Sequence, residues 1–257
     1  MREQFAQIPT PTGTMKTFVT HPVQDGPFPA VVIYMDFWGV REELFNIARW
    51  VGTVGYYCMV PDLYYRQGTV LNRMRDEQGK MMSLSRLDKA TQEKVLEPLK
   101  KLKDAEVMDD TQALLQFLAK EPIVRPGPKG CVGFCLGGRL VMRAAGRFPD
   151  QFKAMASLHG ASLVTDREDS PHRLIDKFQG EFYLGFAEHD PYTSPSTVAT
   201  ITAAAQRSAA KYRYEIHKEA EHGYALPDRD IYDHKASLRD WEIIYAMFQR
   251  QLAPYRL

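Results

Sequence analysis

Gly133-Phe134-Cys135-Leu136-Gly137-Gly138 is the most informative motif of this sequence for its fold. A short apolar run, 130–134, leads into it, and an amphipathic helical pattern, 137–148, follows it. In that context Gly-x-Cys-x-Gly predicts a nucleophile elbow, a strained turn between strand and helix that raises a reactive side chain above the sheet. The glycines fit because side chains two residues to either side of Cys135 would collide with neighbouring backbone. The helix dipole would favour a thiolate at Cys135, although the motif alone also fits a glycine-rich turn with an incidental cysteine.

The chain on either side of the elbow alternates between short apolar runs and helical patterns. We expect strands at 14–19, 30–35, 56–60, 130–134, 154–158, 182–186 and 212–216, and helices at 42–54, 104–118, 137–148, 195–210 and 231–252. This alternation predicts the α/β class, with a mainly parallel central sheet and helices on both faces. In such sheets the reactive groups lie just beyond the carboxyl ends of the strands.

An enzyme with an elbow needs an acid and then a histidine after the nucleophile, in that order. Asp190 follows one predicted strand and His222 follows the last one, so we predict a catalytic triad of Cys135, His222 and Asp190. An Asx turn is the alternative for Asp190, and an exposed loop histidine is the alternative for His222. Glu188 and His189 are weaker candidates for the acid and the base.

The loop after the 30–35 strand, Asp36-Phe37-Trp38-Gly39, lies where enzymes with an elbow form part of an oxyanion hole. We predict that the backbone N–H groups of Phe37 and Leu136 form this hole. Asp36 would then lie close to Cys135 as a second acid. The alternative is that Asp36 serves as a loop or helix-capping carboxylate.

Two further features belong to the predicted surroundings of this site. Trp38, Tyr64 and Tyr224 are predicted to bind substrate in an apolar pocket, and ordinary packing is the alternative for them. The polar segment 66–99 interrupts the alternation of strands and helices. It is either a lid over the site or a solvated surface excursion.

Composition and charge limit the class of protein. The 257 residues carry 33 Lys+Arg against 32 Asp+Glu, a net charge of +1, which removes the electrostatic case for binding nucleic acid or an anionic membrane surface. Apolar runs are far shorter than the ~20 residues that span a bilayer, and the N-terminus lacks an apolar signal core. We therefore expect a single domain over 1–257, located in the cytoplasm, with a small-molecule substrate. The sequence does not predict an oligomeric state.

The three cysteines, Cys58, Cys131 and Cys135, are an odd number, which favours free thiols over a disulfide framework. A redox sensor that uses Cys131 and Cys135 is a weaker interpretation, because their spacing is not the Cys-x-x-Cys of redox motifs. The sequence contains neither a His-Glu-x-x-His motif nor a paired Cys/His cluster, so no metal is predicted.

Several motifs together resemble the dienelactone hydrolase family, in order, from about residue 15 to residue 252. They are Asp36-Phe37-Trp38-Gly39, Pro61-Asp62-Leu63-Tyr64, Gly133-Phe134-Cys135-Leu136-Gly137-Gly138, Asp190 and His222-Gly223-Tyr224. The resemblance implies an α/β-hydrolase fold with a Cys–His–Asp triad and no organic or metal cofactor. Family members open the lactone ring of dienelactone, an intermediate in catechol and chlorocatechol breakdown, and some cleave other esters. In the type enzyme a glutamate at the position of Asp36 keeps the resting cysteine protonated, which implies a switch acid here.

The sequence departs from the family pattern in two ways. Asp36 is one methylene shorter than the family glutamate. Leu226 stands where the type enzyme has one of two arginines that bind the substrate carboxylate, and Arg229 is nearby but not aligned. The second arginine is not identified among Arg66, Arg73, Arg75 and Arg86. A less acidic ester or a thioester is therefore the alternative to dienelactone.

The resulting hypothesis is a carboxylic ester or lactone hydrolase that resembles carboxymethylenebutenolidase. His222 would deprotonate Cys135, and the thiolate would attack the carbonyl to form a thioester acyl-enzyme that water then hydrolyses. The alternative from another class is a non-catalytic binding protein with a hydrolase fold.

Overall fold

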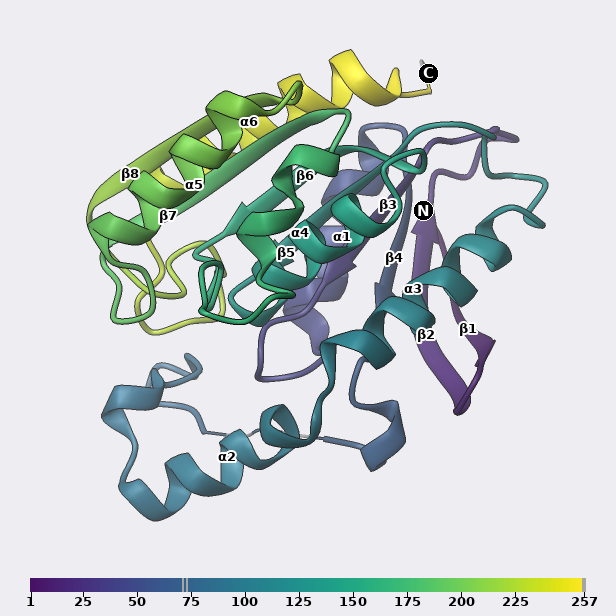
Figure 1. Cartoon of the computed structure of the whole chain (residues 1–257). Helices are drawn as coiled ribbons and strands as arrows, with labels where there is room; N and C mark the ends of the chain where they lie inside the picture. Colours follow the sequence, from purple (N-terminus) through teal and green to yellow (C-terminus); the bar gives the residue numbers. More distant parts are fainter. Residues whose placement is uncertain (71, 73, 256–257) are drawn as a thin grey trace.

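The computed structural model describes residues 1–70, 72 and 74–255, which form an α/β architecture around one sheet of eight strands (Figure 1). The strand order is β1-β2-β4-β3-β5-β6-β7-β8. The β1–β2 and β2–β4 pairs are antiparallel, and every pair from β4 to β8 is parallel. The strands are β1 (Arg2–Thr10), β2 (Gly13–His21), β3 (Ala30–Tyr34), β4 (Tyr57–Pro61), β5 (Lys129–Phe134), β6 (Phe152–Leu158), β7 (Glu181–His189) and β8 (Lys211–Glu221).

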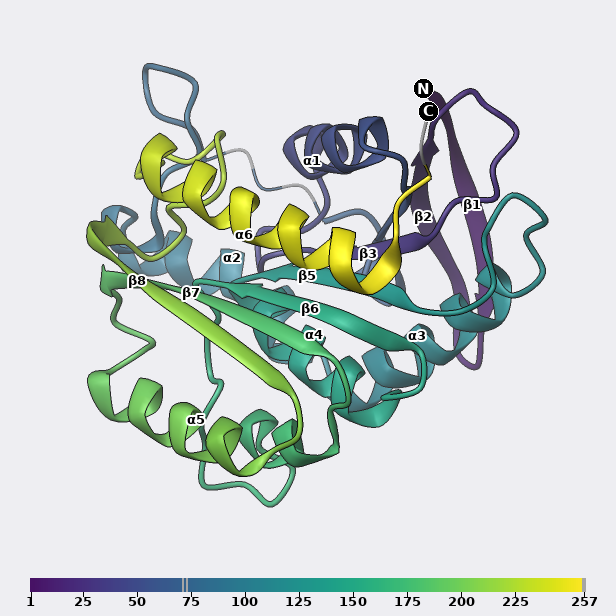
Figure 2. The same ribbon diagram turned by 90° about the horizontal axis from the view of Figure 1, so that it is seen from above.

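Helices cover both faces of the sheet, as the sequence predicts (Figure 2). Helices α1 and α6 lie on one face, and α3, α4 and α5 lie on the other. The helices are α1 (Glu42–Thr53), α2 (Lys89–Lys101), α3 (Asp104–Leu118), α4 (Leu136–Arg147), α5 (Pro195–Arg207) and α6 (His234–Leu252), with short 3₁₀ turns η1 (Tyr65–Gln67), η2 (Leu84–Arg86) and η3 (Pro171–Lys177).

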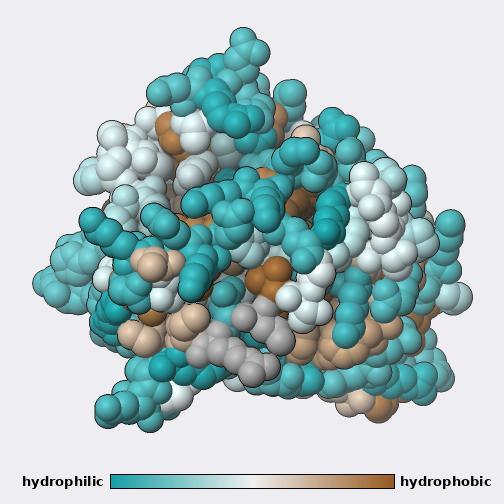
Figure 3. All heavy atoms as spheres, turned by 90° about the horizontal axis from the view of Figure 1, so that it is seen from below, coloured by the Kyte–Doolittle hydropathy of each residue, from teal (hydrophilic) through white to brown (hydrophobic). Residues whose placement is uncertain are grey.

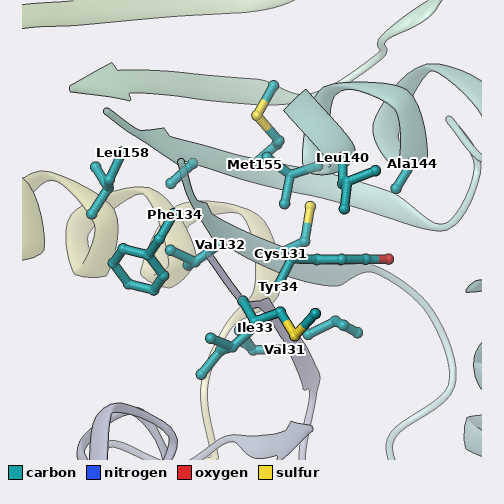
Figure 4. Packing of buried hydrophobic residues seen from close by; sticks show 14 of the residues in the cluster. Val31, Ile33, Tyr34, Cys131, Val132, Phe134, Leu140, Ala144, Met155 and Leu158 are labelled. Carbon is teal, nitrogen blue, oxygen red and sulfur yellow. The ribbon is translucent and has the colours of Figure 1, made fainter. Parts of the chain in front are cut away.

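The centre of the sheet is buried on both faces, which explains the continuous apolar runs of its strands. All residues of β3 and β5 are buried, and the two strands pair in parallel from Val31↔Gly130 to Tyr34↔Gly133. Figure 4 shows Cys131 of β5 pointing toward the side that carries Leu140 of α4. Burial raises the pKa of the Cys131 thiol well above its ordinary value, so this cysteine is a core residue rather than an accessible redox partner.

Two elements escape the sequence analysis because they bury little apolar surface. Strand β1 pairs with β2 along its whole length, yet most of its residues are exposed and only Ile8 is fully buried. Helix α2 has one fully buried residue, Val95, and begins at Asp88, whose side chain accepts a hydrogen bond from the N–H of Thr91. Strand β8 also runs further than predicted and includes His217 within it.

The segment between β4 and α3 lies beyond the edge at which the parallel strands end. In Figure 1 it forms the lower part of the molecule, with α2 at its base. Seen from that side, the surface is mostly hydrophilic with small hydrophobic patches (Figure 3). Within the described ranges 1–70, 72 and 74–255, no helix combines the length and the apolar composition needed to cross a bilayer.

Candidate active site

Cys135 occupies the turn between β5 and α4 in a backbone conformation that L-residues rarely adopt, with φ 52° and ψ −109°. A Cβ atom on Gly133 would collide with the carbonyl oxygen of Gly137, and one on Gly137 would collide with the carbonyl oxygen of Tyr34. The glycines therefore let the start of α4 pack against the ends of two strands. The N–H of Cys135 donates to the carbonyl oxygen of Leu158 in β6 (3.1 Å), which fixes the turn at the carboxyl edge of the sheet. The strained turn predicted from the sequence is present, and the Cys135 side chain is nearly buried, at 8% exposed.

His222 and Asp190 are brought together from the loops after β8 and β7. His222 Nδ1 lies 2.8 Å from Asp190 Oδ2, and because the carboxylate can only accept, the Nδ1–H group donates. The other carboxylate oxygen accepts the backbone N–H of Tyr192 (2.8 Å). This arrangement leaves Nε2 of His222 as the free ring nitrogen, buried and without a hydrogen-bond partner among the described residues.

The charge state of His222 is controlled by its neighbours. Burial lowers its pKa, but the negative charge of Cys135 and the hydrogen bond to Asp190 outweigh burial and raise the pKa to about 10. The sulfur of Cys135 is therefore close enough to interact with the imidazole, although Nε2 forms no well-aligned hydrogen bond.

The loop after β3 approaches the start of α4, where the sequence predicts an oxyanion hole. Within the described chain, the N–H groups of Phe37 and Leu136 have no hydrogen-bond acceptor. The hydroxyl group of Tyr64 donates to the carbonyl oxygen of Phe37 (2.9 Å), which holds this loop. Phe37 lies in this loop and Leu136 is the first residue of α4, and their role as an oxyanion hole stays a prediction.

Asp36 is bound in an ion pair that the sequence analysis did not anticipate. Its Oδ1 lies 2.7 Å from Arg41 Nη1, and the same guanidinium binds Asp228 at 2.6 Å. Asp36 also accepts the N–H of Trp38 (3.2 Å), which matches the alternative of a loop-capping carboxylate. Arg41 thereby joins the loop after β3 to the loop after β8, and the role of Asp36 as a switch acid stays a prediction.

The aromatic residues predicted to bind substrate are all buried. Trp38, Tyr64 and Tyr224 have at most 1% of their surface exposed, and the Tyr224 hydroxyl donates to Asp240 (2.7 Å). Their role in binding substrate stays a prediction. The sequence analysis missed Tyr192, which is 47% exposed and packs edge to face on the His222 ring at 4.6 Å. Its position two residues after the predicted acid was the only signal available.

Arg229 and Leu226 both belong to the loop between β8 and α6 that carries His222, and Leu226 is fully buried in the core. A Cβ atom on Gly223 would be 3.0 Å from Arg229 Nη1. The guanidinium also lies over the Trp38 ring at 5.5 Å and 3.9 Å from Asp36. Arg229 is buried, and the polar contacts of its guanidinium group are 3.4 Å or longer.

The other candidate arginines in the described part of the chain are held by partners within the protein. Arg66 pairs with Asp110 (2.8 Å) and Arg86 with Asp230 (2.7 Å). Arg75 donates to the carbonyl oxygen of Gly79 (2.7 Å). Arg73 lies outside the described residues.

Residues 80–86, which we call the strap, bind the loop that carries His222. The N–H of Met81 donates to the carbonyl oxygen of Asp228 (2.7 Å), and the N–H of Asp230 donates to the carbonyl oxygen of Met81 (3.1 Å). The Asp230 carboxylate accepts from the N–H (2.8 Å) and the hydroxyl (2.6 Å) of Ser83. At least this part of the 66–99 segment is packed against the site loop instead of extending into solvent.

The weaker candidates from the sequence lie on the surface. His189 is exposed and its nearest acid is Glu219 (3.6 Å), while Glu188 accepts the N–H of Glu219 (2.8 Å). These three side chains, two carboxylates and one imidazole, have the spacing of a metal site, but all three are exposed, and such exposed groups are common without a metal. Two cavities, of about 840 and 570 Å³, border α3 and α4, and neither is lined by Cys135.

Comparison with known proteins identifies the family. A sequence model described as "Dienelactone hydrolase family" matches residues 15–252. A protein of Synechocystis sp. named "Putative carboxymethylenebutenolidase" is 25% identical, over 95% of each chain. A solved structure of a protein from Klebsiella pneumoniae named "Putative Dienelactone Hydrolase" has a TM-score of 0.82 at 22% identity, and the match covers 97% of this chain and 98% of that one. The dienelactone hydrolase-like phosphotriesterase P91, from metagenomic libraries, has a TM-score of 0.76 at 17% identity, with 97% and 98% of the two chains covered. These structures share the α/β-hydrolase fold.

Proposed function

Because the chain belongs to the dienelactone hydrolase family, a family of hydrolases, we propose that it cleaves a carboxylic ester or lactone through a triad of Cys135, His222 and Asp190. One observation carries this proposal. His222 is held by Asp190 at 2.8 Å through Nδ1, and the charge of Cys135 raises the pKa of the same ring. Nucleophile, base and orienting acid therefore interact in the order that covalent catalysis needs.

In the proposed reaction the Cys135 thiolate attacks the carbonyl carbon, and the N–H groups of Phe37 and Leu136 bind the oxyanion. Losing one such donor typically costs about 100- to 1,000-fold in kcat. Collapse breaks the C–O bond, and protonated His222 gives its proton to the leaving oxygen. Water, deprotonated by His222, then attacks the thioester and releases the acid and the thiolate.

In this proposal Arg229 determines whether the site favours a charged or a neutral substrate. A buried guanidinium whose polar contacts are 3.4 Å or longer favours an anionic partner, which supports a substrate with a carboxylate. Leu226 offers no such partner, so a neutral ester remains the alternative. For Asp36 to act as a switch acid toward Cys135, its ion pair with Arg41 would have to open.

We also propose that the chain is one domain and that the 66–99 segment covers the site. The strap supports this role because it is hydrogen-bonded to Asp228 and Asp230, on the loop that carries the base. A covering segment would exclude water from the thioester until the product leaves.

The test is turnover of a small panel: cis- and trans-dienelactone, p-nitrophenyl acetate and a neutral lactone. Cys135→Ala should abolish turnover, whereas Cys131→Ala, which alters a buried thiol on the preceding strand β5, should retain it. Turnover of dienelactone would support Arg229 as a carboxylate site, and turnover confined to neutral esters would support the alternative. Full activity in Cys135→Ala would contradict the triad, and ligand binding without turnover of any ester would favour the non-catalytic binding protein.

A further inference from the structure

His159 is a second histidine beside the candidate triad. It follows β6 directly, and its N–H donates to the carbonyl oxygen of Gly185 in β7 (2.8 Å). The preceding residue, Leu158, accepts the N–H of Cys135, and two residues later the N–H of Ala161 donates to the carbonyl oxygen of Cys135 (3.1 Å). His159 is thus built into the hydrogen bonding that holds the nucleophile turn.

The ring of His159 contacts the ring of His222. The two ring centroids are 5.2 Å apart with an interplanar angle of 73°. The centroid of the Tyr224 ring lies 5.4 Å from that of His159. His159 has no exposed surface, and neither of its ring nitrogens has a hydrogen-bond partner in the described part of the chain. Its side chain is therefore a polar group enclosed next to the base.

This arrangement is costly if the imidazole only fills space. A buried polar group without a partner loses its hydration without compensation, and such groups are rare in folded proteins. His159 also has φ 39°, a left-handed conformation that adds strain for a residue with a Cβ atom. A phenylalanine would fill the same space without unpaired nitrogens, so the nitrogens need an explanation.

The surroundings keep His159 neutral. Burial lowers its pKa well below the ordinary value, and the positive charges of His222 and Arg229 lower it further. A neutral imidazole offers one hydrogen-bond donor and one acceptor, but it does not compete with His222 for a proton. Because Nε2 of His222 is also unpartnered, two neighbouring rings present free nitrogens.

We propose that His159 is a further catalytic residue, which hydrogen-bonds the oxygen atom that exchanges a proton with His222. The inference rests on the proposed function. In acylation this oxygen belongs to the leaving group: its bond to the carbonyl carbon breaks, it keeps the electron pair, and it takes the proton of His222. In deacylation it belongs to water: its proton goes to His222, it bonds to the acyl carbon, and the sulfur leaves with the electron pair of the C–S bond. His159 stays neutral in both steps.

The experiment compares His159→Phe, which keeps a ring, with His159→Gln, which keeps a donor and an acceptor. Acylation and deacylation rate constants are measured by stopped flow for a p-nitrophenyl ester and an ethyl ester of one acid. We expect His159→Phe to slow one step about 10- to 100-fold at an unchanged Tm, and His159→Gln to recover part of that loss. Slower deacylation of both esters identifies water as the bound oxygen. Slower acylation of the ethyl ester alone identifies the leaving oxygen, because p-nitrophenolate needs no proton.

Tyr57→Phe is the matched control, since it removes another buried polar atom without a partner, on β4, and should leave both steps unchanged. Wild-type rate constants in His159→Phe would overturn the proposal. Equal losses of rate in His159→Phe and His159→Gln, together with a lower Tm, would also overturn it, because packing would then explain the presence of His159. Failure of the proposed function is seen separately, as turnover that survives Cys135→Ala.

Discussion

Two histidines that lie five positions apart, His217 and His222, each pair with a buried carboxylate, and the two pairs have similar distances and burial. His222 lies 2.8 Å from Asp190, with side chains 10% and 0% exposed. His217 lies 2.6 Å from Asp240, with side chains 9% and 0% exposed. Distance and burial alone do not distinguish them.

The pairs differ in what else each partner binds. Asp240 accepts the hydroxyl groups of Tyr183 (2.6 Å) and Tyr224 (2.7 Å) as well as His217, so this carboxylate ties β7, β8 and α6 together. Asp190 has the backbone N–H of Tyr192 as its other donor, and the free nitrogen of His222 lies near Cys135. A histidine–carboxylate pair by itself therefore indicates only a structural role. What sets the His222 pair apart is that the sulfur of Cys135 lies near its unbound ring nitrogen.

The largest contrast between the pairs should be in catalysis. We expect His222→Gln to lower kcat/KM by at least about 1,000-fold, as removal of a triad base does, and His217→Gln to stay within about threefold of the wild type. Steady-state kinetics with an accepted ester measures both. Comparable losses in the two variants would mean that the pairs act as one unit.

The next contrast concerns stability. Asp240→Asn leaves three buried donors without their charged acceptor, so we expect a loss of about 3 kcal/mol in the free energy of unfolding and a Tm lower by about 6–12 °C. Asp190→Asn removes the acceptor of two donors and should instead lower kcat by about 1,000- to 10,000-fold. Urea unfolding and kinetics on the folded fraction separate the two effects. A catalytic loss in Asp240→Asn equal to that in Asp190→Asn would contradict the division of roles.

A smaller effect should appear in the protonation of the two rings. The charge of Cys135 helps to raise the pKa of His222 to about 10, so Cys135→Ala should lower that pKa. The pKa of His217 is raised by Asp240 against the effect of burial, and Cys135 does not contribute to it. NMR titration of both imidazoles in the wild type and the variant gives the comparison. An unchanged pKa of His222 in Cys135→Ala would mean that the sulfur of Cys135 carries no charge in the wild type.

The smallest effect should be the pH dependence of stability from the His217 pair. Its folded pKa is raised above the ordinary value of 6.5, so the proton is bound more tightly in the folded state. The stabilisation is complete below pH 6.5 and is lost as the pH rises through the folded pKa. The difference in unfolding free energy between wild type and His217→Gln should therefore be largest near about pH 6 and shrink as the pH rises. A difference in unfolding free energy that grows with pH would contradict this prediction, because it would mean that folding lowers the pKa of His217.

The sequence predicted what local patterns determine. The run into Gly133-Phe134-Cys135-Leu136-Gly137-Gly138 identified the strand, the turn and the helix, because steric constraints act within that short stretch. The order of Cys135, Asp190 and His222 predicted which loops meet at the carboxyl edge, and the structure brings His222 to Asp190.

The remaining features depend on distant partners that no local pattern encodes. Arg41 binds Asp36 nearby and Asp228 at a separation of 187 residues. The His217–Asp240 pair was missed because strand β8 extends beyond its apolar part and carries a histidine inward. Strand β1 was missed because its pairing depends on backbone hydrogen bonds rather than on a buried face.

The strap has a consequence for how the protein is made. Ser83 leaves the ribosome 147 residues before its partner Asp230. The strap can therefore dock only after nearly the whole chain has been synthesised, and His222 itself emerges late. A nascent chain thus carries Cys135 for some time without its neighbour His222, and under the proposed function the thiol gains its base only when the last strand and its loop join the sheet.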